Sequence, residues 1–66
     1  HRGLMPAREE PFLIRGPDGK MATVVARTAV GALKRWCVDH PRAVGEVSVK
    51  RRGDDTETWI DYRVDR

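Results

Sequence analysis

Four short segments with strand-like patterns and one longer segment with a helical pattern follow one another along the chain. The strand-like segments are residues 11–16, 21–26, 45–52 and 56–65, and apolar and polar residues alternate most clearly in the last two. Residues 29–39, between the second and the third, carry apolar side chains three and four positions apart, as an amphipathic helix does. The order ββαββ predicts an α+β fold, in which one helix packs on one face of an antiparallel sheet of about four strands.

Residues that favour turns and helix ends bound these segments. Gly16-Pro17-Asp18-Gly19 is a strong turn sequence, because proline presets φ and glycine accepts positive φ. Thr28 can cap the N-terminus of the helix by accepting from unpaired backbone amides. A proline disfavours helical geometry at the residue before it. Pro41 therefore predicts that the helix ends before His40, near residue 39.

The alternation also divides the apolar residues between two faces of the predicted sheet. One helix covers only one face of a sheet, and that face is expected to hold the core. The helix stripe that faces it is predicted to comprise Ala29, Val30, Leu33, Trp36 and Cys37, and the inward strand positions are predicted to be Phe12, Ile14, Ala22, Val24, Ala26, Val47, Val49, Ile60, Tyr62 and Val64. Leu13, Val25 and Trp59 fall in the opposite phase, on the uncovered face.

The position of Trp59 indicates a binding surface rather than a core position. Tryptophan and arginine are the residues most enriched at interface hot spots, because they bury large areas or make forked hydrogen bonds. The alternative is that the indole simply lies flat over its strand neighbours, with arginine stems packed on it. We predict Trp59 as the anchor of a partner-binding surface, and as its orienting charges Arg15, Lys34, Arg35, Lys50, Arg52 and Arg63.

Length and cysteine content limit the class of protein. A chain of 66 residues forms one domain with a thin core, predicted here over residues 11–66 after a flexible N-terminus of residues 1–10. Residues 1–4 are interpreted as a cloning remnant ahead of an initiator Met5. The single cysteine, Cys37, predicts a reducing, cytoplasmic location, and no apolar run approaches the roughly 20 residues that span a membrane.

The charge of the chain is polarised. Residues 27–52 hold seven basic and two acidic side chains, whereas residues 53–66 hold two basic and five acidic ones, within a net charge of +3. The basic part makes nucleic acid a candidate partner, but the acidic final strand would repel a phosphate backbone laid along it.

The sequence contains no clear set of catalytic residues. His40 lies at a helix end, where we expect it to act as a C-terminal cap rather than as a base, and Cys37 lies on the apolar stripe. No phosphate-binding glycine loop is present, because no helix follows the turn at residues 16–19. We therefore predict no enzymatic activity, no cofactor and no metal site.

Three short features resemble a known family. Lys34-Arg35 in the helix, Gly45 at the start of the following strand and Trp59-Ile60-Asp61-Tyr62 in the last strand are similar to the pattern of small phage anti-CRISPR proteins that inhibit type I surveillance complexes. Those proteins are likewise single helices packed on short antiparallel sheets. The resemblance covers roughly the C-terminal half, and it implies a stoichiometric inhibitor that docks on a CRISPR-associated protein or on its DNA path.

The sequence thus predicts a small non-enzymatic binding protein, of the phage or mobile-element inhibitor type, that docks on a protein or nucleoprotein partner through its sheet face. A small DNA- or RNA-binding protein that uses the basic helix and hairpin is the first alternative. A homodimer closed through the uncovered face is the second, and no membrane partner is expected.

Overall fold

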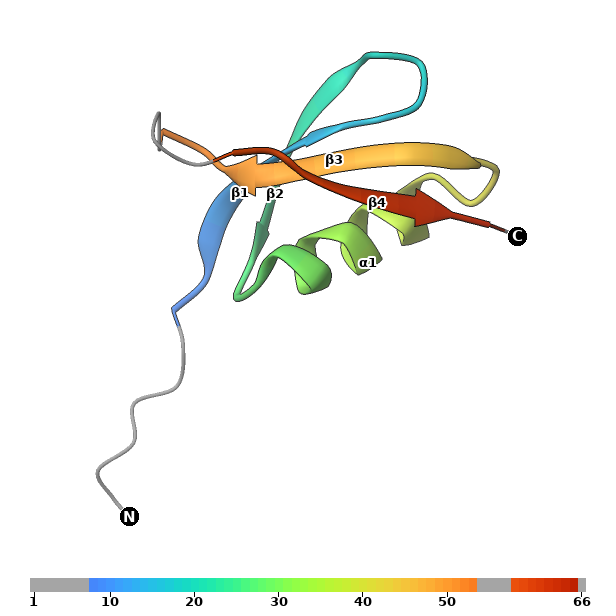
Figure 1. Cartoon of the computed structure of the whole chain (residues 1–66). Coiled ribbons are helices and arrows are strands. Elements are labelled where there is room, and N and C mark those ends of the chain that lie inside the picture. Colours follow the sequence, from blue (N-terminus) through green and yellow to red (C-terminus); the bar gives the residue numbers. More distant parts are fainter. Residues whose placement is uncertain (1–7, 54–57, 66) are drawn as a thin grey trace.

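The computed structural model describes residues 8–53 and 58–65, which form a four-stranded antiparallel sheet with one helix (Figure 1). The elements in chain order are β1 (Glu10–Arg15), β2 (Met21–Ala26), α1 (Ala29–Asp39), β3 (Gly45–Arg51) and β4 (Ile60–Val64). The predicted α+β class and the order ββαββ are confirmed. Residues 1–4 lie outside the described residues, so their interpretation as a cloning remnant stays a prediction.

The strands are ordered β2-β1-β3-β4 in the sheet. β1 pairs with β2 through the hairpin, in which Phe12 lies opposite Val24, and on its other side with β3, in which Ile14 lies opposite Val49. β3 pairs in turn with β4. The long-range pairing of β1 with β3 therefore places the two hairpins side by side, with β2 and β4 as the edges.

The core lies between α1 and the sheet, as the alternation predicts. It is formed by Phe12, Ile14, Ala26, Ala32, Trp36, Val47, Val49 and Val64. Ile14, Val47 and Val49 are the largest side chains that are fully buried. Burial of apolar area at about 25 cal/mol per Å² is the main favourable term for such a thin core, so each of these residues matters to stability.

The ends of α1 are where the sequence predicts them. The Thr28 hydroxyl accepts a hydrogen bond from the Gly31 amide at 3.0 Å, which satisfies one of the four unpaired amides of the first turn. The helix ends at Asp39, and the amide of His40 donates to the Cys37 carbonyl. The His40 ring stacks on Trp36 with 4.2 Å between ring centroids, so this residue closes the core as well as the helix.

The predicted stripe of α1 needs a correction. Val30 is exposed, whereas Ala32, which the prediction left off the stripe, is fully buried. The helix is rotated so that its small residues face the sheet, and a Cβ added at Gly31 would lie 3.7 Å from the Cβ of Ala26 on β2. Ala32 is thus buried in the core, Gly31 lies at ordinary contact distance from β2, and the bulkier Val30 turns outward.

The first turn also shapes the core. The amide of Gly16 donates to the Lys20 carbonyl and that of Gly19, with φ of 84°, donates to the Gly16 carbonyl. Gly16 is buried, and a Cβ added there would lie 3.0 Å from Cζ2 of Trp36. The turn therefore requires positive φ at Gly19 and lets the indole of Trp36 pack directly on the backbone at Gly16.

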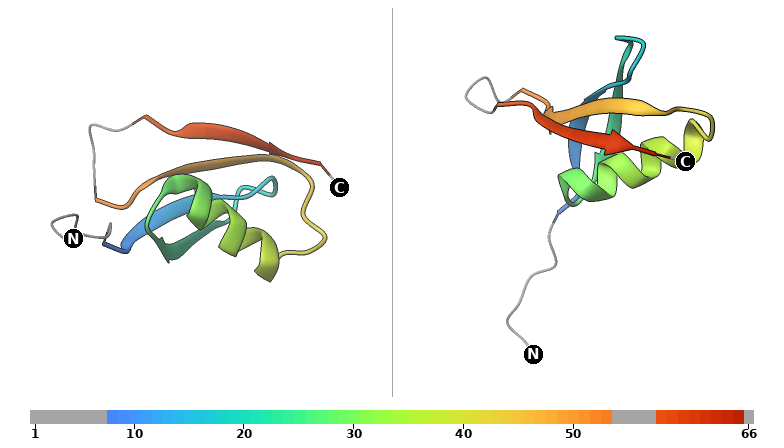
Figure 2. Two further views of the ribbon diagram at one scale, coloured as in Figure 1. Left: turned by 90° about the horizontal axis from the view of Figure 1, so that it is seen from below. Right: turned by 45° about the vertical axis from the view of Figure 1, so that its right-hand side comes forward.

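β4 lies outside the cover of the helix. α1 contacts β2, β3 and β1 but not β4, and the view from the helix side shows β4 beyond the helix (Figure 2, left). Ile60, which the alternation placed in the core, is consequently 50% exposed, and Tyr62 is half-buried, whereas Val64 is buried. The described part of the chain contains no helix long and apolar enough to cross a membrane.

Candidate functional site: the uncovered face of the sheet

Trp59 immediately precedes β4 and lies on the sheet face opposite α1. Val49 pairs with Ile60 across β3 and β4, which brings the next residue of β3, Lys50, beside Trp59. Val49 belongs to the buried core, so the alternation directs Lys50 and Trp59 away from the helix. The indole is half-buried and is not part of the core.

Two cationic side chains lie against the indole of Trp59. The Arg15 guanidinium carbon is 4.7 Å from the ring centroid, and Nζ of Lys50 is 5.1 Å from it. Both distances are within the range of a cation–π interaction, which contributes about 0.5–1 kcal/mol at an exposed site. Arg15 comes from β1 and Lys50 from β3, so the register of three strands assembles this cluster.

We call the surface around this cluster the Trp59 face. It is formed by the outward positions of the four strands and by Trp59 itself: Pro11, Leu13, Arg15, Met21, Thr23, Val25, Glu46, Ser48, Lys50, Trp59, Asp61 and Arg63. No helix covers it. Ser48 is nevertheless 7% exposed, because the side chains around it shield it. The face is therefore a layer of long side chains lying on the sheet, with apolar groups among them.

The apolar part of the Trp59 face lies over the first hairpin. Leu13 is half-buried, and its neighbours on the β2 edge, Met21 and Val25, are 54% and 46% exposed. The strand register places Leu13 opposite Lys50, so the apolar patch continues across the sheet to the Trp59 cluster. Exposed apolar side chains that adjoin one another, rather than scattered ones, are the kind that mark interaction surfaces.

The acidic residues of the Trp59 face lie along β3 and β4: Asp61 is the outward residue next to Trp59, and Glu46 lies one row further from the indole. Asp61 accepts a short hydrogen bond from the Ser48 hydroxyl at 2.6 Å, and Glu46 lies opposite Arg63 in the register. Arg63 itself pairs with Asp65 at 3.2 Å. In contrast, neither Arg15 nor Lys50 has a carboxylate partner within the described part of the chain. Among the described residues, the contact that both cations share is with the indole.

The other predicted site residues lie elsewhere. Lys34 is exposed on α1, on the opposite side of the sheet from Trp59. Arg35 reaches back from α1 to the β2 edge, where one guanidinium nitrogen donates to the Val25 carbonyl and the other pairs with Glu9 at 2.9 Å. Arg35 thus holds the helix to the β2 edge.

Arg52 lies in the turn after β3, and its amide donates to the Pro11 carbonyl at 3.0 Å. Of the seven residues predicted for partner binding, the structure therefore brings together three, Trp59, Arg15 and Lys50, in direct contact. Arg63 shares their face but lies toward its acidic end.

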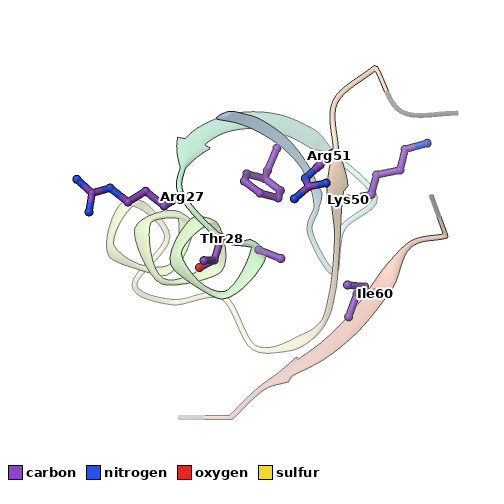
Figure 3. A pocket seen from close by; sticks show the side chains of 7 residues that line it. Arg27, Thr28, Lys50, Arg51 and Ile60 are labelled. Carbon is purple, nitrogen blue, oxygen red and sulfur yellow. The ribbon is translucent and has the colours of Figure 1, made fainter. Parts of the chain in front are cut away.

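The overhang of β4 creates a hollow that the sequence did not reveal. A cavity of about 230 Å³ opens between the N-terminus of α1 and β4 (Figure 3). Its lining comprises Phe12, Arg27, Thr28, Ala29, Lys50, Arg51 and Ile60. Arg27 and Lys50 extend away from the hollow in Figure 3, whereas Arg51 lies in the middle of the view, so the lining combines apolar groups with one guanidinium. One signal in the sequence could have indicated this hollow. Ile60 was predicted to be in the core, but the helix can bury it only if it reaches the last strand.

Within residues 8–53 and 58–65, no three His, Cys, Asp or Glu side chains lie close enough together to hold a metal ion. No protein-family model, curated protein or solved structure matches this chain. The resemblance to small anti-CRISPR proteins therefore stays a prediction.

Proposed function

We propose that this chain is a non-enzymatic binding module that docks on a protein or nucleoprotein partner through the Trp59 face. The observation that supports it is the contact of a half-exposed indole with two cations that have no carboxylate partner in the described residues, on a face without a helix. Burying that indole against a partner releases ordered water from a large apolar surface, which is the main favourable term in association.

The charges around Trp59 indicate the sign of the partner surface. Arg15 and Lys50 flank the indole, whereas Asp61 is held by the Ser48 hydroxyl on the neighbouring row and Glu46 lies one row further. An anionic group on the partner meets the two cations without first breaking an ion pair, and charge complementarity of this kind speeds association and fixes the orientation of docking. The proposed partner therefore presents a negatively charged surface to this end of the face.

The resemblance to anti-CRISPR proteins gives the proposal one specific form. In that form the chain is a phage or mobile-element inhibitor that acts stoichiometrically in the cytoplasm on a CRISPR-associated protein or nucleoprotein complex. Its test is DNA binding by a purified type I surveillance complex in the presence of the chain: the proposed inhibitor abolishes DNA binding near one equivalent, and unchanged DNA binding at excess chain contradicts this form.

The docking proposal itself is tested by capture with matched variants. The chain, Trp59→Ala and Val38→Ala are immobilised and exposed to extract, because Val38 is 78% exposed on the outer side of α1 and serves as a control position. A retained partner is then purified and its affinity is measured by calorimetry. The proposal expects Trp59→Ala to weaken binding by at least about 2 kcal/mol, the usual threshold for a hot spot, and Val38→Ala to leave the affinity unchanged.

Two results contradict the docking proposal. One is a set of captured molecules that bind Trp59→Ala as well as the parent chain. The other is a sedimentation mass near twice 7.5 kDa that Trp59→Ala returns to the monomer value, which would assign the Trp59 face to a homodimer instead.

A further inference from the structure

We infer that the ligand of the Trp59 face is a single-stranded nucleic acid, whose phosphates meet Arg15 and Lys50 and whose bases lie against the Trp59 indole. This inference rests on the proposed function and names the class of its partner. It starts from the contact of one aromatic ring with two cations from two different strands. Proteins that bind single strands combine cations that track the backbone with aromatic side chains on which bases stack.

The first step of the argument is that the two cations are available. Arg35, Arg51 and Arg63 each have a carboxylate within 4 Å, namely those of Glu9, Glu10 and Asp65. Arg15 and Lys50 have none within the described residues. A phosphate can therefore take a position beside the indole without displacing a carboxylate, and the electrostatic gain is not offset by a broken ion pair.

The second step is that a path free of acidic residues crosses the face. The strand register sets Lys50 of β3 beside Leu13 of β1, and Leu13 beside Thr23 of β2. From Trp59 across this row to the β2 edge, the outward side chains are cationic, apolar or hydroxyl-bearing. Asp61 lies on the row of Arg15, with Ser48 between them, and Glu46 lies one row further, so a nucleic acid strand that follows the row of Lys50, Leu13 and Thr23 crosses the sheet without passing over either carboxylate.

The third step is the shape of the surface. The face is an open antiparallel sheet of four strands with side chains lying on it, and no second helix is available among the described elements to enter a duplex groove. The splayed bases of a single strand can lie on an open sheet and contact Trp59. The bases of a duplex are stacked inside the helix and are out of reach of Trp59. These observations favour a single strand over a duplex. They also favour it over an acidic protein, because carboxylates gain little from an exposed aromatic ring on which bases can stack.

The test is fluorescence anisotropy with a labelled oligothymidylate of about 12 nucleotides, a length within the range that one small domain covers. The same measurement is made with oligouridylate, with a duplex of equal length and with a labelled poly-glutamate peptide. We expect the full chain to bind the single strands at least about tenfold more tightly than the duplex. Trp59→Ala should weaken this binding about tenfold or more, whereas Trp59→Phe, which keeps an aromatic ring, should retain most of it.

The dependence of the affinity on salt concentration distinguishes phosphate contacts at Arg15 and Lys50 from unspecific attraction by the net positive charge of the chain. Each phosphate contact to a single strand contributes about 0.7 to the slope of log affinity against log salt concentration. The double variant Arg15→Gln/Lys50→Gln should therefore lower that slope by about 1.4. The charge-matched control Lys34→Gln/Arg42→Gln removes two exposed cations away from the face and should leave the slope nearly unchanged.

Three outcomes overturn the inference: no binding of either oligonucleotide at low salt, equal loss in the two double variants, or preference for the duplex. Trp59-dependent binding of poly-glutamate without binding of the oligonucleotides also overturns it, but leaves the docking proposal standing with an acidic protein as partner. Oligonucleotide binding that Trp59→Ala leaves unchanged overturns the inference as well, and the capture experiment then decides the docking proposal by itself. Circular dichroism of each variant shows whether it is folded. An unfolded Trp59→Ala is replaced by Trp59→Leu, which keeps apolar volume but no aromatic ring, and an unfolded double variant by the single glutamine substitutions.

Discussion

The Arg15 guanidinium lies 4.7 Å from the centroid of the Trp59 ring, although the two residues are 44 positions apart in the chain. The strand order β2-β1-β3-β4 brings them onto one surface, because β3 lies between β1, which carries Arg15, and β4, which follows Trp59. This contact depends on the pairing of the two hairpins, and the proposed function depends on this contact.

Removal of the guanidinium should therefore cost a small but measurable part of the stability of the free chain. Arg15→Gln is expected to lower the free energy of unfolding by about 0.5–1 kcal/mol, the size of an exposed cation–π interaction. Lys34→Gln is the control, because Lys34 is exposed on α1 and lies on the other side of the sheet. Urea titrations followed by circular dichroism measure both. Equal losses in the two variants would show that Arg15 and Trp59 do not interact.

Because β4 extends beyond the helix, two isoleucines should differ in their contribution to stability. Ile14 is fully buried, whereas Ile60 on β4 is 50% exposed because α1 does not reach β4. Ile14→Ala should lower the free energy of unfolding by about 2–5 kcal/mol, through lost burial and the cavity left behind. Ile60→Ala should cost less than about 1 kcal/mol, as a partly exposed position does. Thermal unfolding of the two variants compares them directly, and losses of similar size would mean that the helix covers β4 after all.

The contact between Gly16 and Trp36 makes a second prediction about the core. A Cβ at Gly16 would lie 3.0 Å from the indole of Trp36, which is 5% exposed and held by its stacking on His40. Gly16→Ala should therefore destabilise the chain by about 1–3 kcal/mol, as overpacking does. Val38→Ala on the exposed side of α1 serves as the neutral reference in the same denaturant titrations. A Gly16→Ala variant as stable as the parent chain would show that the indole can move aside.

Local patterns in the sequence were sufficient to predict the elements. The bounds of α1 follow from the cap at Thr28 and from the constraint that Pro41 places on the residue before it. Both effects act within a few residues. The two faces of β1 and β3 follow from their alternation, and the buried Phe12, Ile14, Val47 and Val49 confirm the predicted inward phase.

The arrangement of the elements could not be predicted in the same way. α1 is oriented with Ala32 buried and Val30 exposed, whereas hydrophobic spacing alone favoured Val30 over Ala32. Whether one helix reaches the fourth strand depends on strand order and on the twist of the sheet, which are long-range properties. This is why the exposure of Ile60 was missed.

The same distinction applies to the candidate site. The outward phase of Trp59 is local, and the sequence predicted it. The contact of Trp59 with Arg15 and Lys50 requires the register of three strands. Arg35 was predicted from its residue type alone, and only the structure shows that its guanidinium joins α1 to the β2 edge.

The central claim is that the Trp59 indole lies outside the core that Trp36 anchors, and the stability of Trp59→Ala compared with Trp36→Ala tests it most directly. The two substitutions remove the same side chain, one from a half-exposed position and one that is 5% exposed. Denaturant titration should give Trp59→Ala a cooperative transition with a loss of about 1 kcal/mol, and Trp36→Ala a loss of about 3–5 kcal/mol or no folded state. A loss in Trp59→Ala as large as that in Trp36→Ala would place both indoles in the core and contradict the account.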